Sequence, residues 1–256
     1  MVALYSKPVR ILMKEMASEL VVHPSDSFTR QQAISWFAEK YPRIKTGTVT
    51  AHLTRLSTNA RSRIHHNIIK GEDDVLYQTN RASYRLYRPG VDATPIYEAL
   101  GDIGSSPLPE GEDEVEAIQE AGSNGEFAYE ADLRNYLSKN LSLLEPSLKL
   151  FEDEGVTGIE FPVGGRYIDI LAVDSSGNFV VIELKVSKGY DRVVGQLMRY
   201  VAWIKENLAD EAQRVRGVII ARNISNDLKL ACSLVPEIGL FEYELSLSLR
   251  RINSES

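Results

Sequence analysis

The chain has 256 residues, of which 43% are hydrophobic and 25% are charged, as in ordinary globular proteins with one or two domains. No apolar stretch approaches the roughly 20 residues that span a bilayer, and the N-terminus has no signal-peptide pattern. We therefore expect a cytoplasmic protein without a membrane partner. Cys232 is the only cysteine, which excludes an intrachain disulfide and a thiolate metal site.

The net charge of −7 is distributed unevenly along the chain. Residues 1–92 contain 14 basic and 8 acidic residues, residues 93–126 contain 9 acidic residues and no basic one, and residues 127–256 contain 15 basic and 19 acidic residues. Glycine, proline and mutually repelling carboxylates keep the middle segment extended. We predict a basic domain at 1–92, an acidic linker at 93–126 and a second domain at 127–256.

The first domain is predicted to contain three helices and a β-hairpin. Apolar residues at helical spacing predict a helix over 7–20. Thr29 and Gln32 form a capping box for a second helix, which Pro42 ends, and a third helix buries Val49 and Leu53. Residues 75–77 and 84–87 are predicted to be strands of a hairpin, while 57–74 fit none of these elements.

This order of elements resembles the winged helix-turn-helix arrangement, in which the third helix enters the major groove of DNA. The resemblance implies that hydroxyl and basic side chains on the third helix, and others on the following segment and the hairpin, contact phosphates and base edges. These candidates are Lys45, Thr46, Thr48, Thr50, His52, Arg55, Arg61, Arg63, Arg81 and Arg85. The alternatives are a small helical domain whose charged face is merely solvated, or a module that binds another protein.

The second domain is predicted to be α+β, with a mixed sheet flanked by helices. In chain order we expect a helix over 129–140, strands over 159–163, 167–173 and 179–186, and a helix over 192–208. An apolar strand over 215–221, a helix through Cys232 and a strand over 240–245 follow. The whole chain is thus expected to be an α/β (α+β) protein.

The polar residues that could bind a metal or take part in catalysis concentrate in the hairpin over 167–186. Glu183 and Lys185 end an apolar strand and point to the same side, because residues two apart share a face. A three-residue loop with Gly177 in the left-handed conformation would place Asp169 opposite Glu183. A loop of two or four residues would instead move Asp169 off the site. Two adjacent carboxylates can bind a Mg²⁺ ion that keeps part of its water shell.

Asp169, thirteen intervening residues and then Glu183-x-Lys185 resemble the PD-(D/E)xK nuclease signature. The position before Asp169 holds Ile168 rather than the proline of the name, and that position is loose in the superfamily. On the next helix, Gln196 and Tyr200 resemble the Q-x-x-x-Y element of the RecB-like branch.

Glu130 resembles the additional acidic residue of the RecB-like branch, and residues 127–250 are most similar to the C-terminal domain of NucS/EndoMS-type endonucleases. The resemblance implies that Asp169, Glu183 and the Leu184 carbonyl bind Mg²⁺, for which Mn²⁺ would substitute. It implies that Lys185 positions water or steadies the developing charge. Gln196 and Tyr200 would orient these groups or contact phosphate, and Glu130 would reach the metal through water. The predicted helices of residues 1–92 depart from the β-rich N-terminal domain of that family.

The resemblances together predict a Mg²⁺-dependent endonuclease of the restriction, defence or DNA-repair type, acting on double-stranded DNA as a homodimer. The negative charge of residues 127–256 supports another hypothesis, a DNA-binding regulator whose nuclease fold is catalytically silent. The sequence also allows a nuclease that acts on RNA.

Overall fold

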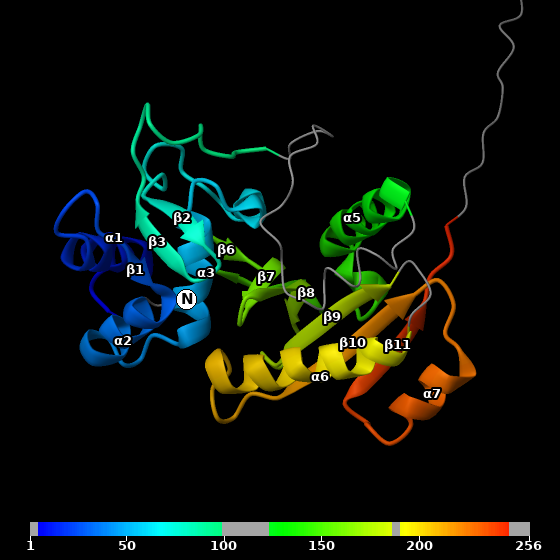
Figure 1. Cartoon of the computed structure of the whole chain (residues 1–256). Coiled ribbons are helices and arrows are strands. Elements are labelled where there is room, and N and C mark those ends of the chain that lie inside the picture. Colours follow the sequence, from blue (N-terminus) through cyan, green and yellow to red (C-terminus); the bar gives the residue numbers. More distant parts are fainter. Residues whose placement is uncertain (1–4, 99–122, 186–189, 246–256) are drawn as a thin grey trace, which may run out of the picture.

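The computed structural model of the chain describes residues 5–98, 123–185 and 190–245 (Figure 1). Most of the predicted acidic linker, residues 99–122, lies outside the described residues. The described part is a mixed α and β structure, as predicted, and none of its helices is long and apolar enough to cross a membrane.

The N-terminal unit contains the predicted helices and hairpin. Helices α1 (Val9–Leu20), α2 (Arg30–Lys40) and α3 (Thr46–Leu56) are accompanied by strands β1 (Phe28–Thr29), β2 (Leu76–Asn80) and β3 (Ser83–Leu86). The strands form an antiparallel sheet in the order β1-β3-β2. The capping box is confirmed, since the backbone N–H of Gln32 donates to Thr29 Oγ1 at 3.2 Å and that of Thr29 donates to Gln32 Oε1 at 2.8 Å.

Two segments of this unit were not assigned by the sequence patterns. A short 3-10 helix, η1 (Arg61–His65), occupies part of 57–74. Residues beyond the predicted boundary at 92 pack back on the unit, because the N–H of Ile96 donates to the Thr58 carbonyl at 2.9 Å and the Tyr97 hydroxyl bonds to Asp74. The start of the predicted linker is therefore part of the folded N-terminal unit.

The C-terminal unit is built on a six-stranded mixed sheet of order β11-β10-β9-β8-β4, with β7 also paired to β8. Its strands are β4 (Lys149–Leu150), β7 (Ile159–Val163), β8 (Arg166–Val173), β9 (Phe179–Lys185), β10 (Val215–Ala221) and β11 (Ile238–Glu242). β9, β10 and β11 are parallel, whereas β8 is antiparallel to β9.

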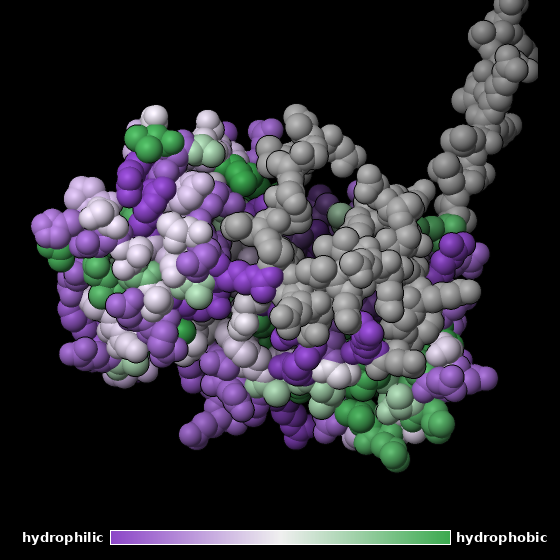
Figure 2. All heavy atoms as spheres, in the orientation of Figure 1, coloured by the Kyte–Doolittle hydropathy of each residue, from purple (hydrophilic) through white to green (hydrophobic). Residues whose placement is uncertain are grey.

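Helices cover both faces of this sheet. Leu133 and Leu137 of α5 (Ser123–Lys139) pack with Val180 and Ile182 of β9 on one face. On the other face, α6 (Tyr190–Asn207) and α7 (Asn226–Cys232) pack against a second apolar cluster (Figure 1). The remaining elements are η2 (Leu141–Leu143) and a small hairpin of β5 (Glu152–Asp153) and β6 (Val156–Thr157). Apolar side chains gather on the surface around α7 (Figure 2), where Leu230 and Leu234 are exposed.

The two units are joined by the β5–β6 turn, which inserts into the N-terminal unit. The carboxylate of Glu154 in this turn accepts the N–H of Val9 at the start of α1, at 2.6 Å. The carbonyl of the same residue accepts from Arg55 of α3, and the Gly155 carbonyl accepts the N–H of Asn67 at 2.8 Å. Helix α3 is thereby enclosed by elements of both units.

Candidate active site

The β8–β9 hairpin closes with the three-residue loop on which the site prediction depends. The N–H of Asp174 donates to the Asn178 carbonyl at 3.0 Å, and the Asp174 carboxylate accepts the N–H groups of Ser176 and Asn178. Gly177 has a φ of 79°, a conformation that glycine adopts without steric cost. The odd-numbered loop is confirmed.

This loop sets the register that brings Asp169 to Glu183. The hydrogen-bonded pairs of β8 and β9 end at Ile170 and Ile182, so the next positions in the same register hold the two acidic residues. Where the ladder ends, the side chain of Asp169 takes the place of a main-chain acceptor, because its Oδ2 receives the N–H of Leu184 at 2.8 Å. The site therefore lies where the two strands part.

Glu183 is the centre of a hydrogen-bonded group that includes three of the predicted residues. Its Oε1 accepts from Lys185 Nζ at 2.9 Å and from Gln196 Nε2 at 2.7 Å. Gln196 Nε2 also lies 3.1 Å from the hydroxyl of Tyr200, one turn further along α6. The second oxygen of Glu183, Oε2, is buried and has no hydrogen-bond partner among the described residues.

Three carboxyl groups, those of Glu183, Asp169 and Glu130, lie close enough at the site to raise one another's pKa. Burial raises the pKa of Glu183 to about 8, opposed by Lys185 and helped by the charges of Asp169 and Glu130. Burial and the charge of Asp169 likewise raise the pKa of Glu130 to about 7, and burial raises the pKa of Asp169. Burial alone would lower the pKa of Lys185, but the carboxylates of Glu183 and Asp169 outweigh it and raise that pKa.

A divalent cation fits these residues. The unpartnered Oε2 of Glu183 offers a ligand, and a positive charge beside Asp169 and Glu183 would reverse the cost of burying their charged forms. Within the described ranges, no three acidic, histidine or cysteine side chains are close enough to complete a metal site by themselves. The cation would therefore also need main-chain oxygen and water, which is usual for Mg²⁺.

Two charged residues at the site were missed by the sequence analysis. Arg134 of α5 binds Glu160 of β7, with Nη2 2.6 Å from Oε1, and its Nη1 lies 3.8 Å from Asp169 Oδ1. Glu160 has a φ of 45°, uncommon for a residue other than glycine, and its Oε2 lies 3.6 Å from His65 Nε2 of the N-terminal unit. Arg134 could have been noticed because it follows Glu130 by one helical turn. Glu160 gave no comparable signal.

The prediction that α3 exposes its polar side is wrong. His52 and Arg55 are 0% and 3% exposed, and Thr50 is 4% exposed. The β5–β6 turn and the apolar core of the C-terminal unit, to which Ala51 of α3 contributes, cover that side. Burial lowers the pKa of His52 to about 3, and neither of its ring nitrogens has a hydrogen-bond partner in the described structure.

Several of the predicted DNA-binding arginines are neutralised inside the N-terminal unit. Arg55 lies 2.8 Å from the Asp73 carboxylate. Arg63 is fully buried, contrary to the prediction, and lies 2.9 Å from Asp74. Arg85 is half-buried and lies 2.5 Å from Asp92. Arg61 and Arg81 are exposed.

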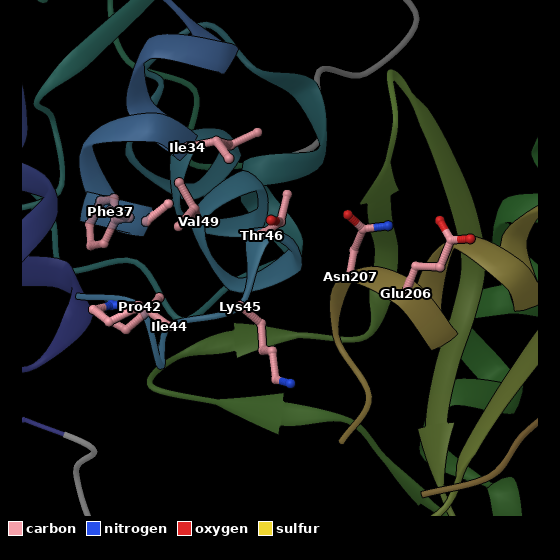
Figure 3. A pocket seen from close by; sticks show the side chains of 10 residues that line it. Ile34, Phe37, Pro42, Ile44, Lys45, Thr46, Val49, Glu206 and Asn207 are labelled. Atoms are coloured by element: carbon pink, nitrogen blue, oxygen red, sulfur yellow. The ribbon is translucent and has the colours of Figure 1, made fainter. Parts of the chain in front are cut away.

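The start of α3 faces the end of α6 rather than open solvent. Lys45 and Thr46 line a cavity of about 200 Å³ whose opposite wall includes Glu206 and Asn207 of α6 (Figure 3). Lys45 Nζ also lies 3.2 Å from Asp210 Oδ1, just beyond α6. A side chain at Gly47 would have its Cβ 3.1 Å from the carbonyl oxygen of Asn207, so this close approach requires glycine. Thr48 is half-buried.

Comparison with known proteins identifies the two parts of the chain separately. Residues 129–246 match the family model described as the endonuclease NucS C-terminal domain, and residues 8–86 match a domain of unknown function, DUF7669. The chain is 30% identical over 112 residues to the endonuclease NucS of Pyrococcus furiosus and 33% identical over 102 residues to that of Thermococcus kodakarensis.

These matches cover 43% and 39% of this chain but only 37% and 36% of the relatives, so the chain spans about a third of their length. A solved structure described as a repair endonuclease from Pyrococcus abyssi is 27% identical, covers 48% of each chain and has a TM-score of 0.37. The chain thus combines a segment similar to the endonuclease NucS C-terminal domain, residues 129–246, with a segment similar to DUF7669, residues 8–86.

Proposed function

We propose that the protein is a Mg²⁺-dependent endonuclease that hydrolyses phosphodiester bonds of double-stranded DNA. The observation that carries the proposal is the unpartnered, buried Oε2 of Glu183 in a cluster with Asp169, Lys185 and Gln196. Packing gives no reason for such an arrangement, because a buried carboxylate oxygen that lacks a hydrogen bond costs stability. The relatives named endonuclease NucS support the same reaction class.

Asp169, Glu183 and the carbonyl of Leu184 would hold the divalent cation, with Mn²⁺ as a substitute for Mg²⁺. When bound, such a cation makes water more acidic and stabilises the charge that develops on phosphate. Gln196 binds Oε1 of Glu183 and so leaves Oε2 directed to the ligand position.

Lys185 keeps its proton, because the neighbouring carboxylates raise its pKa. The ammonium group is therefore available to orient the attacking water or to stabilise the negative charge on the phosphate. Glu130, whose pKa is raised to about 7, would bind a water ligand of the cation or exchange a proton with it.

We propose an enzyme of the restriction, defence or DNA-repair type in the cytoplasm, whose target is chosen with the help of the N-terminal unit. Cleavage of both strands by a single kind of site calls for two copies, so we propose a homodimer. The exposed Leu230 and Leu234 around α7 provide apolar surface of the kind that such contacts cover.

The test is cleavage of plasmid, methylated and unmethylated genomic DNA, and mismatched and branched duplexes, with Mg²⁺, Mn²⁺ or a chelator. We expect Glu183→Gln to lower cleavage by about 100-fold or more, because metal stabilisation of the transition state amounts to several kcal/mol. Glu237→Gln, the same change at an exposed residue, should cleave like the parent. The proposal fails if every substrate stays intact with both metals, or if Glu183→Gln cleaves as well as the parent.

A further inference from the structure

We infer that the two units share one binding surface for the phosphate backbone of duplex DNA, which runs from the β2–β3 turn to the candidate active site. This surface, here called the arginine track, consists of Arg81, Arg30, the turn Gly164–Gly165, Trp203 and Arg199. It rests on the proposed function and names the part of the N-terminal unit that would hold the substrate. It differs from the predicted recognition helix, which is buried.

The track begins at the hairpin of the N-terminal unit. Arg81 lies in the β2–β3 turn and is exposed. Arg30, the first residue of α2, donates from Nη2 to the carbonyl of Arg81 at 2.6 Å. The Arg30 guanidinium is thereby held against the main chain of Arg81, so both arginines lie at the same end of the unit, where they can contact successive phosphates.

Arg30 also connects this end of the N-terminal unit to the sheet of the C-terminal unit. A Cβ on Gly165, in the β7–β8 turn, would lie 3.8 Å from Nη1 of Arg30. Gly164 and Gly165 have φ values of 57° and 93°, and the flanking Val163 and Arg166 are paired, so the turn has two residues and no side chains. Such a turn lets a phosphate approach the main chain closely.

Helix α6 continues the track to the catalytic residues. A Cβ on Gly164 would lie 3.4 Å from Nε1 of Trp203. Trp203 follows Gln196 by seven residues on α6, which places both on one helical face, and Gln196 binds Glu183. Arg199 lies between them in sequence, one turn before Trp203, and is exposed. The line from Arg81 to Glu183 is therefore continuous, and it combines arginine with an aromatic ring, as nucleic-acid surfaces do.

Three acidic residues of the N-terminal unit are paired with arginines outside the track. Asp73, Asp74 and Asp92 pair with arginines elsewhere in the unit, namely Arg55, Arg63 and Arg85. Residues 1–92 contain 14 basic and 8 acidic residues, and Arg81 is exposed beside Arg30. A polyanion would be attracted to this end rather than to the buried side of α3.

The experiment uses the full chain with Glu183→Gln, so that DNA is bound and not cut. Fluorescence anisotropy of a labelled duplex gives the dissociation constant at several salt concentrations. Adding Arg81→Gln and Arg199→Gln should weaken binding by about tenfold or more and lower the slope of log affinity against log salt by about 2, since each lost phosphate contact lowers it by about 0.9. Arg81→Gln alone, in an exposed turn, should lower the slope by about 1.

The matched control is the pair Arg43→Gln and Lys149→Gln, which removes the same charge from two exposed side chains outside the track. Lys149 pairs with Val173, at the end of β8 away from the site. The inference is overturned if the track variant binds duplex DNA with the parent's affinity and slope, or if the control weakens binding equally. In that outcome cleavage by the unmodified chain would still support the proposed function, whereas a parent that neither binds nor cleaves would overturn both.

Discussion

Replacement of Arg55 by alanine tests whether α3 is buried, as in the structure, or is the exposed recognition helix that the sequence indicates. Arg55 donates to the carbonyl of Glu154 in the C-terminal unit, to the Asn67 carbonyl at 2.8 Å and to the Asp73 carboxylate at 2.8 Å. Without it, the carboxylate of Asp73, which is 0% exposed, keeps Arg10 at 3.6 Å and the N–H of Ile69 at 2.9 Å.

The expected loss of stability follows from that uncompensated charge. Removing one partner of a buried ion pair costs about 3–5 kcal/mol. For a chain of this size, each kcal/mol lowers Tm by about 2–4 °C, so Arg55→Ala should lower Tm by roughly 6–20 °C. Arg43→Ala, which removes an exposed arginine from the same unit, should change the stability by less than about 0.5 kcal/mol.

The Tm of the variant and the parent is measured by circular dichroism, and their affinity for DNA is measured by fluorescence anisotropy. An Arg55→Ala protein that unfolds at the parent's temperature but binds DNA more weakly would refute the reasoning. That result would mean that the arginine is exposed on a DNA-binding helix and that the contact with Glu154 does not form. A lower Tm with unchanged affinity in the folded protein would agree with the structure.

Four further substitutions test other parts of the fold. His52→Leu should raise the free energy of unfolding at pH 7 by about 1–3 kcal/mol, because it removes two unpaired buried nitrogens. The pKa of His52 is about 3 in the fold, so as pH falls below 6.5 the unfolded chain binds the proton and the folded protein does not. The free energy of unfolding of the parent should therefore fall by about 2 kcal/mol between pH 7 and pH 5 because of His52. Urea unfolding should show a smaller fall in the variant. Gly158→Ala should lower Tm sharply, since its Cβ would lie 2.0 Å from a carbonyl oxygen of β8, whereas Gly195→Ala, in open space on α6, should raise Tm slightly. Arg134→Gln should cost about 2 kcal/mol by thermal unfolding, because Glu160 loses its 2.6 Å partner, and an unchanged Tm would show that this pair is not formed.

The elements of the C-terminal unit and the positions of its candidate site residues could be predicted because their signals are local. Gly177 fixes the loop, the loop fixes the register, and the register determines that Asp169 meets Glu183. The spacing of Gln196 and Tyr200 on one helix is equally local, and their contact is present at 3.1 Å. No local signal predicts the small hairpin of β5 and β6, because its strands are only two residues long.

The buried polar side of α3 could not be predicted, because its partners come from distant parts of the chain. The helical pattern identifies Val49 and Leu53 as core residues and leaves His52 and Arg55 on the other side, where charged residues are normally exposed. The carbonyl that receives Arg55 lies 99 residues away, in a turn between two short strands. The pairing of Arg134 with Glu160 likewise joins a helix to a strand whose residues have no recognisable spacing.

The burial of α3 places the N-terminal unit against helix α6 of the candidate site. Helix α6 carries Gln196 at its site end and meets Gly47 at its other end, through the carbonyl of Asn207. The amino end of one helix thus lies against the carboxyl end of the other, which their dipoles favour. Since His65 also lies 3.6 Å from Glu160, the N-terminal unit contacts both α6 and β7. A unit held in this way would present the arginine track in a fixed relation to Glu183, so that the position of a bound duplex determines which phosphate reaches the site.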